Sequence, residues 1–239
     1  CPTTGIQAQL PVLLAEYTFY HISDEPQLKT LENYKTAAEI IHPLIGRSKT
    51  CDAISNYEFY EKGLTECPVT AVESIHTFLA YGIDDQWVYY CCQPQSVYPN
   101  AFMAMPSYRI RILGVLLYKY NIKGFLHWGF NFWFSQYSVS VQNPYMDTTA
   151  GGGFQSGDAF VVYPLDENGE VVCSLRLYVF NETMQDMRAL KLLELLAGRQ
   201  TVVDMLKDID GFGSYPRNSH YIIQLRELVN AKIKTMMNL

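Results

Sequence analysis

Short apolar runs alternate with helical patterns along the first half of the chain, and this alternation limits the fold more than any other feature. Four apolar runs each predict a strand, at residues 17–22, 49–54, 86–92 and 124–133. The segments between them carry apolar side chains at spacings of three and four, which is typical of amphipathic helices, at residues 28–41, 72–82 and 107–120. Strands that alternate with helices build βαβ units, so the sequence predicts an α/β fold with a parallel sheet.

The second half of the chain departs from this alternation. A long loop over residues 134–157 is followed by a hairpin across 166–169. Two or three helices then finish the chain, at about residues 177–197, 201–209 and 220–237. Four strand–helix units are too few to close an eight-stranded barrel, which typically needs about 250 residues. We therefore expect the later strand–helix units of a (β/α)8 TIM-type barrel over residues 1–197. Residues 198–239 are expected to form a helical extension of the same domain, and an open sheet is the alternative.

Composition excludes several classes of partner. The 239 residues carry a net charge of −6 and no basic tract, so nucleic-acid binding is not expected. No apolar run reaches 18 residues, so no membrane span is expected either. Aromatic residues make up 14% of the chain, which suits both a sugar site and an ordinary core. Oligomeric state is left open.

Six cysteines lie at irregular spacings and form neither a CxxC motif nor a Cys/His ligand set, so structural zinc is not expected. Cys51, Cys91 and Cys92 fall in predicted strands, where buried free thiols are common. Unpaired thiols favour a reducing compartment such as the cytoplasm. A secreted form, or a lipoprotein that begins with a lipidated Cys1, is the other possibility.

Asp24 and Glu25 are the candidate catalytic residues. They follow the first predicted strand directly and precede a helix, and parallel α/β folds bind ligands outside the carboxyl ends of their strands. Neighbouring carboxylates raise each other's pKa, which suits one of them to act as a general acid. Acids that merely decorate a helix start are the alternative interpretation. His21, in the same strand, is expected to be a packed side chain.

A series of motifs in order along the chain resembles glycoside hydrolase family 123, the β-N-acetylgalactosaminidases. The similarity spans roughly residues 10 to 197, and the order of the motifs is more specific than any one of them. The motifs are Tyr17-Thr-Phe-Tyr-His-Ile-Ser-Asp-Glu-Pro26, Trp87-Val-Tyr-Tyr-Cys91, Gly124-Phe-Leu-His-Trp-Gly-Phe-Asn-Phe-Trp133, Gly157-Asp-Ala-Phe-Val-Val-Tyr-Pro164 and Ser174-Leu-Arg-Leu177.

The resemblance implies retaining hydrolysis of a terminal 2-acetamido sugar, in which the acetamido oxygen of the substrate attacks its own anomeric carbon. This substrate-assisted route is an exception to the usual two-carboxylate scheme. By position in the motif, Glu25 matches the acid/base and Asp24 the residue that orients the acetamido group. A glycan or glycolipid end is the expected substrate, and no cofactor or metal is expected.

Six further residues are candidates for sugar binding. Tyr57 is expected to hydrogen-bond the acetamido carbonyl, with Tyr60 as the alternative. Trp128 and Trp133 should face opposite sides if their strand stays regular, so at most one should enter the pocket. The substrate-binding candidates are Tyr57, Trp87, Trp128, Asn131, Trp133 and Asp158.

Three functions remain open at this level. The first is removal of terminal β-linked N-acetylgalactosamine (GalNAc). The second is a related hexosaminidase that prefers N-acetylglucosamine (GlcNAc), and the third is a non-catalytic sugar-binding fragment. An exposed Glu25 beside Asp24, with a tyrosine hydroxyl nearby, would favour an enzyme, whereas a closed core at that point would exclude it.

Overall fold

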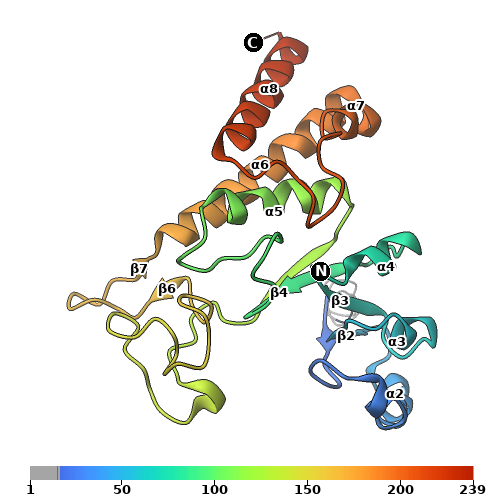
Figure 1. The fold of residues 1–239 in the computed structure, drawn as a ribbon. Coiled ribbons are helices and arrows are strands. Elements are labelled where there is room, and N and C mark those ends of the chain that lie inside the picture. Colours follow the sequence, from blue (N-terminus) through green and yellow to red (C-terminus); the bar gives the residue numbers. More distant parts are fainter. Residues whose placement is uncertain (1–14, 16, 239) are drawn as a thin grey trace, which may run out of the picture. The chain divides into compact units, whose positions relative to one another are not determined.

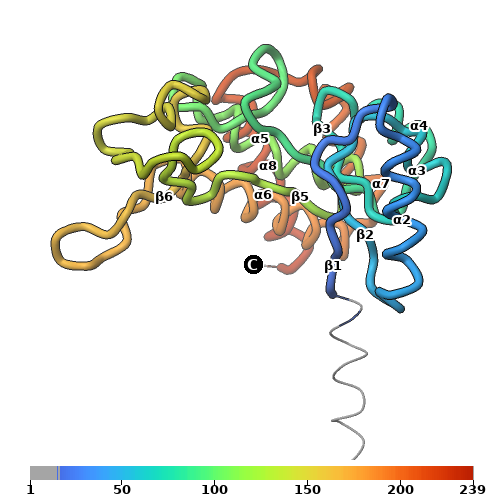
Figure 2. Tube along the Cα trace, turned by 90° about the horizontal axis from the view of Figure 1, so that it is seen from below, coloured from blue at the N-terminus to red at the C-terminus, as the bar shows by residue number. Residues whose placement is uncertain are grey.

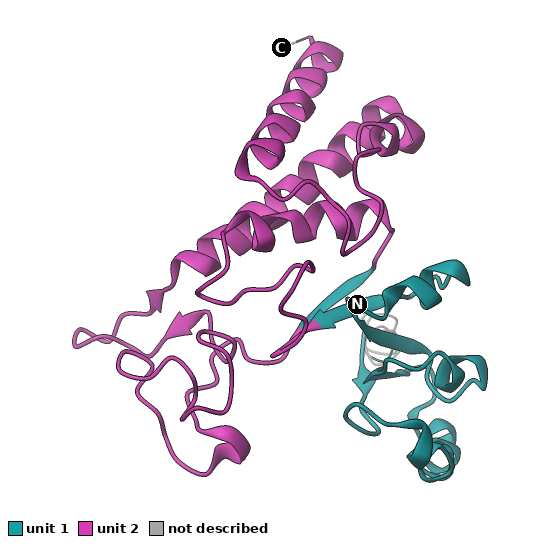
Figure 3. Cartoon of the chain, viewed as in Figure 1, with its two compact units in different colours: residues 1–89, 123–126 teal, residues 90–122, 127–239 magenta. Residues whose placement is uncertain are grey.

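The structure, a computed structural model, describes Ala15 and residues 17–238 (Figure 1). These residues form two compact units, which are described separately (Figure 3). The first unit contains the described residues up to Tyr89 together with Lys123–Leu126. The second contains Tyr90–Ile122 and the described residues from His127 onward.

A five-stranded sheet with the order β1-β2-β3-β4-β5 is the framework of the first unit. Strands β1 to β4 pair in parallel, each with the next. The strands are β1 (Phe19–Tyr20), β2 (Lys49–Ala53), β3 (Cys67–Ala71), β4 (Trp87–Tyr90) and β5 (Gly124–His127). This mixed α/β fold with a parallel sheet confirms the predicted fold class, while a complete eight-stranded barrel stays a prediction.

The sheet is curled, and the contact between Phe19 and Trp87 demonstrates this. The two side chains come from β1 and β4, which are separated by two intervening strands, yet their ring centroids lie 5.3 Å apart. Three strand spacings in a flat sheet would place the backbones about 14 Å apart. The face that carries Phe19 and Trp87 is therefore concave.

Three α-helices of the first unit lie on the same side of strands β1–β3 in both ribbon and tube views (Figures 1 and 2). The short helix η1 (Leu28–Thr30) leads into α2 (Leu31–Ile45), and α3 (Glu58–Glu61) and α4 (Ile75–Ala80) follow the next two strands. Their apolar faces bury Phe59, Ile75 and Phe78 completely. This is the outer helical layer expected of βα units.

His42, Pro43 and Gly46 were expected to end α2. The helix continues through His42 and Pro43 to Ile45 and ends at Gly46, which has a φ of 61°. Pro43 lies in the last turn, where only one carbonyl, that of Glu39, loses a partner. Glu39 is exposed, so its carbonyl is open to solvent.

Strand β3 is an element that the apolar pattern did not predict, and it raises the number of strands from four to five. It contains Pro68, and a proline normally counts against a central strand because it cannot donate to the ladder. All five residues of β3 are buried, and Gln86 donates from its side chain to the Pro68 carbonyl at 3.1 Å. Burial on both faces thus outweighs the missing donor.

Strand β5 is shorter than predicted, since it ends at His127 instead of residue 133. The chain beyond it is irregular, with isolated bridges from Asn131 to Phe160 and from Phe134 to Val141. Trp128 and Trp133 were expected to face opposite sides only if a regular strand carried both, and it does not. Both pack against one small cluster of Ala150, Ala159 and Phe160.

Long helices dominate the second unit (Figure 1). Its elements are α5 (Tyr108–Lys119), η2 (Gln136–Ser138), β6 (Val162–Tyr163), β7 (Val172–Cys173), α6 (Leu175–Ala197), α7 (Arg199–Asp204) and α8 (Ser219–Met237). The predicted hairpin is confirmed as the antiparallel pair β6–β7. Two or three final helices were predicted, and the structure has three, α6, α7 and α8.

Helix α5 packs closely against α6, and Gly114 permits the approach because a Cβ there would lie 2.1 Å from the Thr183 carbonyl oxygen. The Thr183 hydroxyl in turn donates to the Ile110 carbonyl at 3.1 Å. Asp186 of α6 accepts from Arg111 at 2.6 Å and from Arg226 of α8 at 2.8 Å. One carboxylate therefore links three helices.

Cys51, Cys67, Cys92 and Cys173 are free thiols. Cys51, Cys91 and Cys92 are half-buried instead of buried, and Cys1 lies outside the described residues. Among the described helices, none combines the length and the apolar character that a bilayer crossing requires.

Candidate active site

The acid pair lies in the turn between β1 and η1. Both Asp24 and Glu25 are exposed, so neither is part of a closed core. Glu25 has a φ of 43°, a left-handed conformation that is strained for a residue with a side chain. Pro26, the next residue, is buried and anchors the chain where it leaves the pair. The turn therefore presents two carboxylates to solvent at the carboxyl end of a parallel strand.

Tyr89 supplies a hydroxyl to this pair. Its phenol O–H donates a hydrogen bond to Oε1 of Glu25. Tyr89 lies near the carboxyl end of β4, in register with Ala71 of β3, and its ring is buried. A buried ring fixes the direction of its hydroxyl, so the Glu25 carboxylate is held from the opposite side of the curled sheet.

Glu73, two residues beyond β3, is a third carboxylate at this edge. Burial raises its pKa; its own backbone amide acts in the opposite direction, and the negative charge of Glu25 raises the pKa further. Its Oε2 atom is buried and has no hydrogen-bond partner within the described part of the chain. The Glu25 charge, beyond the carboxyl end of β1, thus acts on Glu73, beyond that of β3.

Two predicted sugar-binding residues belong to the first unit, away from direct contact with the pair. Tyr57 precedes α3 and stacks on Tyr81, with ring centroids 4.0 Å apart and planes 8° from parallel. Trp87 lies two residues before Tyr89 on β4, so both side chains point to the same concave face. Trp87 forms a deeper layer of that face, roughly 7 Å along the strand from Tyr89.

Trp128 and Asp158 come together in the second unit. Asp158 is almost fully buried, and burial raises its pKa to about 6, although the nearby Trp128 indole and Arg176 lower it. Neither the Trp128 indole nitrogen nor Oδ2 of Asp158 has a hydrogen-bond partner of normal geometry in the described chain. A buried donor and acceptor left in this state are the groups that a bound hydroxyl or water would satisfy.

Asn131 and Trp133 have different surroundings. Trp133 is half-buried, and its indole N–H donates to the Val162 carbonyl at 3.0 Å, which fixes the ring against the β6–β7 hairpin. Asn131 is exposed and pairs through its backbone with Phe160. Of these two side chains, only that of Asn131 is fully available to a ligand.

Sequence interpretation missed three residues of this region: Tyr89, Glu73 and Asp52. Tyr89 follows Trp87 by two positions, so the strand alternation that selected Trp87 applies equally to Tyr89. Glu73 was missed because β3 itself was missed. Asp52 is a lone carboxylate inside an otherwise apolar strand, and it is fully buried in the structure.

A family model described as "Glycoside hydrolase 123, catalytic domain" matches residues 12–193 of this sequence. The chain belongs to glycoside hydrolase family 123. The match covers the acid pair, the whole five-stranded sheet and most of α6. The family resemblance inferred from the sequence motifs is thereby confirmed.

A solved structure of a family 123 glycoside hydrolase from Clostridium perfringens, described in terms of glycolipid glycan hydrolysis, has a similar fold. The two chains share 18% identity and a TM-score of 0.62 over 99% of this chain. The matched region is 43% of the Clostridium chain, so this family 123 chain spans less than half of its relative's length. No curated protein sequence matches the present chain.

Proposed function

We propose that this family 123 chain forms part of a glycosidase that removes terminal β-linked GalNAc from glycan or glycolipid ends by a retaining, substrate-assisted mechanism. The observation that carries the proposal is the exposed Asp24–Glu25 pair at a strand end, with the Tyr89 hydroxyl bonded to Glu25. Membership of a glycoside hydrolase family and the described activity of the Clostridium relative support it.

Glu25 is proposed to protonate the leaving glycosidic oxygen and later to deprotonate the attacking water. Asp24 is proposed to accept the acetamido N–H and to stabilise the positive charge that develops as the acetamido oxygen attacks the anomeric carbon. Adjacent residues suit these roles because the leaving oxygen and the acetamido group are attached to neighbouring carbons of one sugar. The bond to the leaving group breaks as the oxazoline ring forms, and water then opens that ring.

The remaining predicted residues keep binding roles within this proposal. Tyr57 is proposed to hydrogen-bond the acetamido carbonyl, and Tyr89 is a second candidate because its hydroxyl already lies beside Glu25. Trp87 is proposed as the aromatic floor of the concave face. In the second unit, Trp128, Asn131, Trp133 and Asp158 are proposed to contact sugar hydroxyls or shape their subsite.

Hydrolysis of p-nitrophenyl β-GalNAc by the full-length protein tests the proposal. Glu25→Gln should lower the rate by roughly 100- to 10,000-fold, the usual contribution of a general acid. Glu32→Gln, at an exposed acid on α2, is the matched control and should retain the wild-type rate. A wild-type rate in the Glu25 variant would reject the acid role.

The mechanism and the sugar are tested separately. A GalNAc-thiazoline, which mimics the oxazoline, should inhibit competitively, and the first product seen by NMR should be the β-anomer. An α-anomer, or an active enzyme that ignores the thiazoline, would reject substrate assistance. Faster turnover of the GlcNAc glycoside would indicate the related hexosaminidase, and sugar binding without turnover would indicate a non-catalytic protein.

A further inference from the structure

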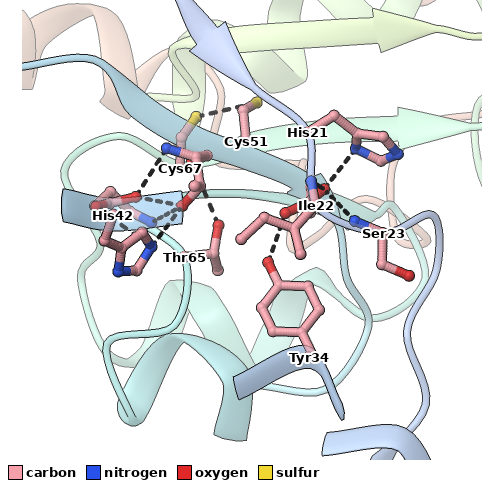
Figure 4. A network of polar contacts seen from close by, with 11 residues as sticks. His21, Ile22, Ser23, Tyr34, His42, Cys51, Thr65 and Cys67 are labelled. Atoms are coloured by element: carbon pink, nitrogen blue, oxygen red, sulfur yellow. Dashed lines mark hydrogen bonds and ion pairs between the residues drawn. The ribbon is translucent and has the colours of Figure 1, made fainter. Parts of the chain in front are cut away.

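Asp52, the fourth residue of β2, has a fully buried carboxyl group that accepts three hydrogen bonds and also contacts His21. Its Oδ1 accepts from the backbone amides of Ile22 at 2.9 Å and Ser23 at 3.2 Å, and it lies 2.5 Å from Nδ1 of His21. Its Oδ2 accepts from the Tyr34 hydroxyl at 2.5 Å. Figure 4 shows these four residues turned toward one point. The three donors thus meet both oxygens of one carboxyl group.

The contacting residues come from both sides of the acid pair along the chain. His21, Ile22 and Ser23 immediately precede Asp24, whereas Tyr34 belongs to α2, which follows the pair. Burial, followed by the hydrogen bond to Asp52, raises the pKa of Tyr34 well above its usual value, so the phenol keeps the proton that it donates. One buried carboxylate therefore links the two arms of the turn that carries Asp24 and Glu25.

This link explains how the turn maintains its strained residue. Glu25 has a φ of 43°, and such a conformation persists only where the surrounding structure fixes it. Within the turn, the side-chain amide of Gln27 donates to the Glu25 carbonyl at 3.2 Å, but this contact is exposed. The bonds to Asp52 are more shielded from water, because Asp52 has no exposed surface.

We propose that Asp52 is the positioning residue of the acid pair, holding Glu25 where it can protonate the leaving group. Asp52 itself is too buried to touch substrate, so it acts through the turn and is not a catalytic residue. The inference deepens the proposed function and, for its kinetic part, rests on it. Tyr34 and His21 serve as the two side-chain contacts of the same carboxylate.

Substrates with different leaving groups test this inference on the full-length protein. A misplaced acid slows glycosides with poor leaving groups, which need protonation, more than those with good ones. Asp52→Asn offers an N–H in place of one acceptor and should lower kcat about 100-fold for the methylumbelliferyl β-GalNAc glycoside. The loss for the dinitrophenyl glycoside should stay below about 10-fold, with little change in KM. Tyr34→Phe removes one donor only and should show the same pattern more weakly.

Thr50→Val is the matched control. Thr50 is also fully buried on β2, two residues before Asp52, and its hydroxyl donates to Glu66 instead of contacting the turn. This variant should lose thermal stability to a similar extent while both glycosides keep the wild-type ratio of kcat values. An equal loss for both glycosides in Asp52→Asn, or the wild-type rate for both, would overturn the positioning role.

Hydrogen exchange separates this inference from the proposed function. The Ile22 and Ser23 amides should be protected in the wild type and in Thr50→Val. In Asp52→Ala they should exchange at least about 10-fold faster, because their acceptor is gone. If the wild type hydrolyses neither glycoside, the proposed function fails, and the exchange result still decides whether Asp52 holds the turn. Free exchange of both amides in the wild type would overturn the inference.

Discussion

The Tyr89 hydroxyl donates to the Glu25 carboxylate across a separation of 64 residues in the chain. Tyr89 belongs to β4 and Glu25 to the turn that follows β1, and these two strands are not neighbours in the sheet. Their contact is possible only because the sheet curls, as the Phe19–Trp87 contact one layer below also requires. The curvature that brings strand ends together thus gives the exposed acid a fixed partner.

Tyr89→Phe should slow hydrolysis without unfolding the protein. The substitution removes only the hydroxyl that bonds Glu25 and leaves the buried ring in place. A hydrogen bond to a charged group contributes about 1.5–3 kcal/mol, so kcat/KM should fall roughly 10- to 100-fold. Tyr178→Phe makes the same chemical change at an exposed position on α6 and should leave the rate unaltered. Equal rates in wild type and Tyr89→Phe would show that the contact has no kinetic role.

Glu73→Gln should stabilise the protein at neutral pH but not in acid. Burial raises the pKa of Glu73, and the Glu25 charge raises it further, so the folded state holds this proton to a higher pH than the unfolded state does. Stability is therefore lost as pH rises above about 4.5, and glutamine removes that loss. Because Glu73 is half-solvated, the gain should stay below about 1 kcal/mol. Urea unfolding at pH 4 and pH 7.5 measures the gain in the free energy of unfolding. An equal gain at both pH values would contradict the prediction.

Local patterns predicted the parts of this fold that depend on a single element. The α6 and α8 helices and the β6–β7 hairpin follow from apolar spacing and turn residues, and the structure confirms them. The sequence pattern did not predict strand β3, because this strand depends on burial between β2 and β4, and that burial outweighs the local effect of Pro68. Strand β5 ends early because the chain after His127 pairs with later parts of the second unit, through the Asn131–Phe160 and Phe134–Val141 bridges.

The residues of the candidate site likewise fall into those with a local sequence signal and those that only the tertiary structure brings together. The acid pair was predictable because position after a strand is a local property. Tyr89 and Glu73 depend on which strand ends converge, and this follows from sheet order and curl instead of from spacing. Asp52 left a local signal, a carboxylate within an apolar strand, but its partners at residues 21–23 and 34 are set by the tertiary structure.

His127→Gln should reduce the acid sensitivity of the second unit. Burial, followed by the charge of Arg176, lowers the pKa of His127 to about 4, so the folded state resists protonation. The unfolded chain takes up this proton below about pH 6.5, and stability falls as pH drops from there toward 4. The wild type should lose about 3 kcal/mol more than the variant between pH 7.5 and pH 4. Parallel pH curves for the two proteins would contradict this expectation.

Asp158→Asn should have the opposite pH dependence. The pKa of Asp158 is raised from 3.8 to about 6 by burial, so its folded state binds a proton that the unfolded state has already released. Stability is lost as pH rises from about 4 to 6, and at pH 7.5 the buried charge costs about 3 kcal/mol. The asparagine variant should therefore unfold at higher urea than the wild type at pH 7.5, and at nearly equal urea at pH 3.5.

Asp166→Asn is the control of opposite sign for this last prediction. Asp166, in the exposed β6–β7 hairpin loop, accepts backbone hydrogen bonds from Asn168 and Glu170, and the contact with Glu170 is the main cause of its lowered pKa. A lowered pKa stabilises the folded state above the unfolded value, so this variant should lose stability at pH 7.5 and little at pH 3.5. If both asparagine variants shifted stability in the same direction at pH 7.5, the buried position of Asp158 would not be the cause of its effect.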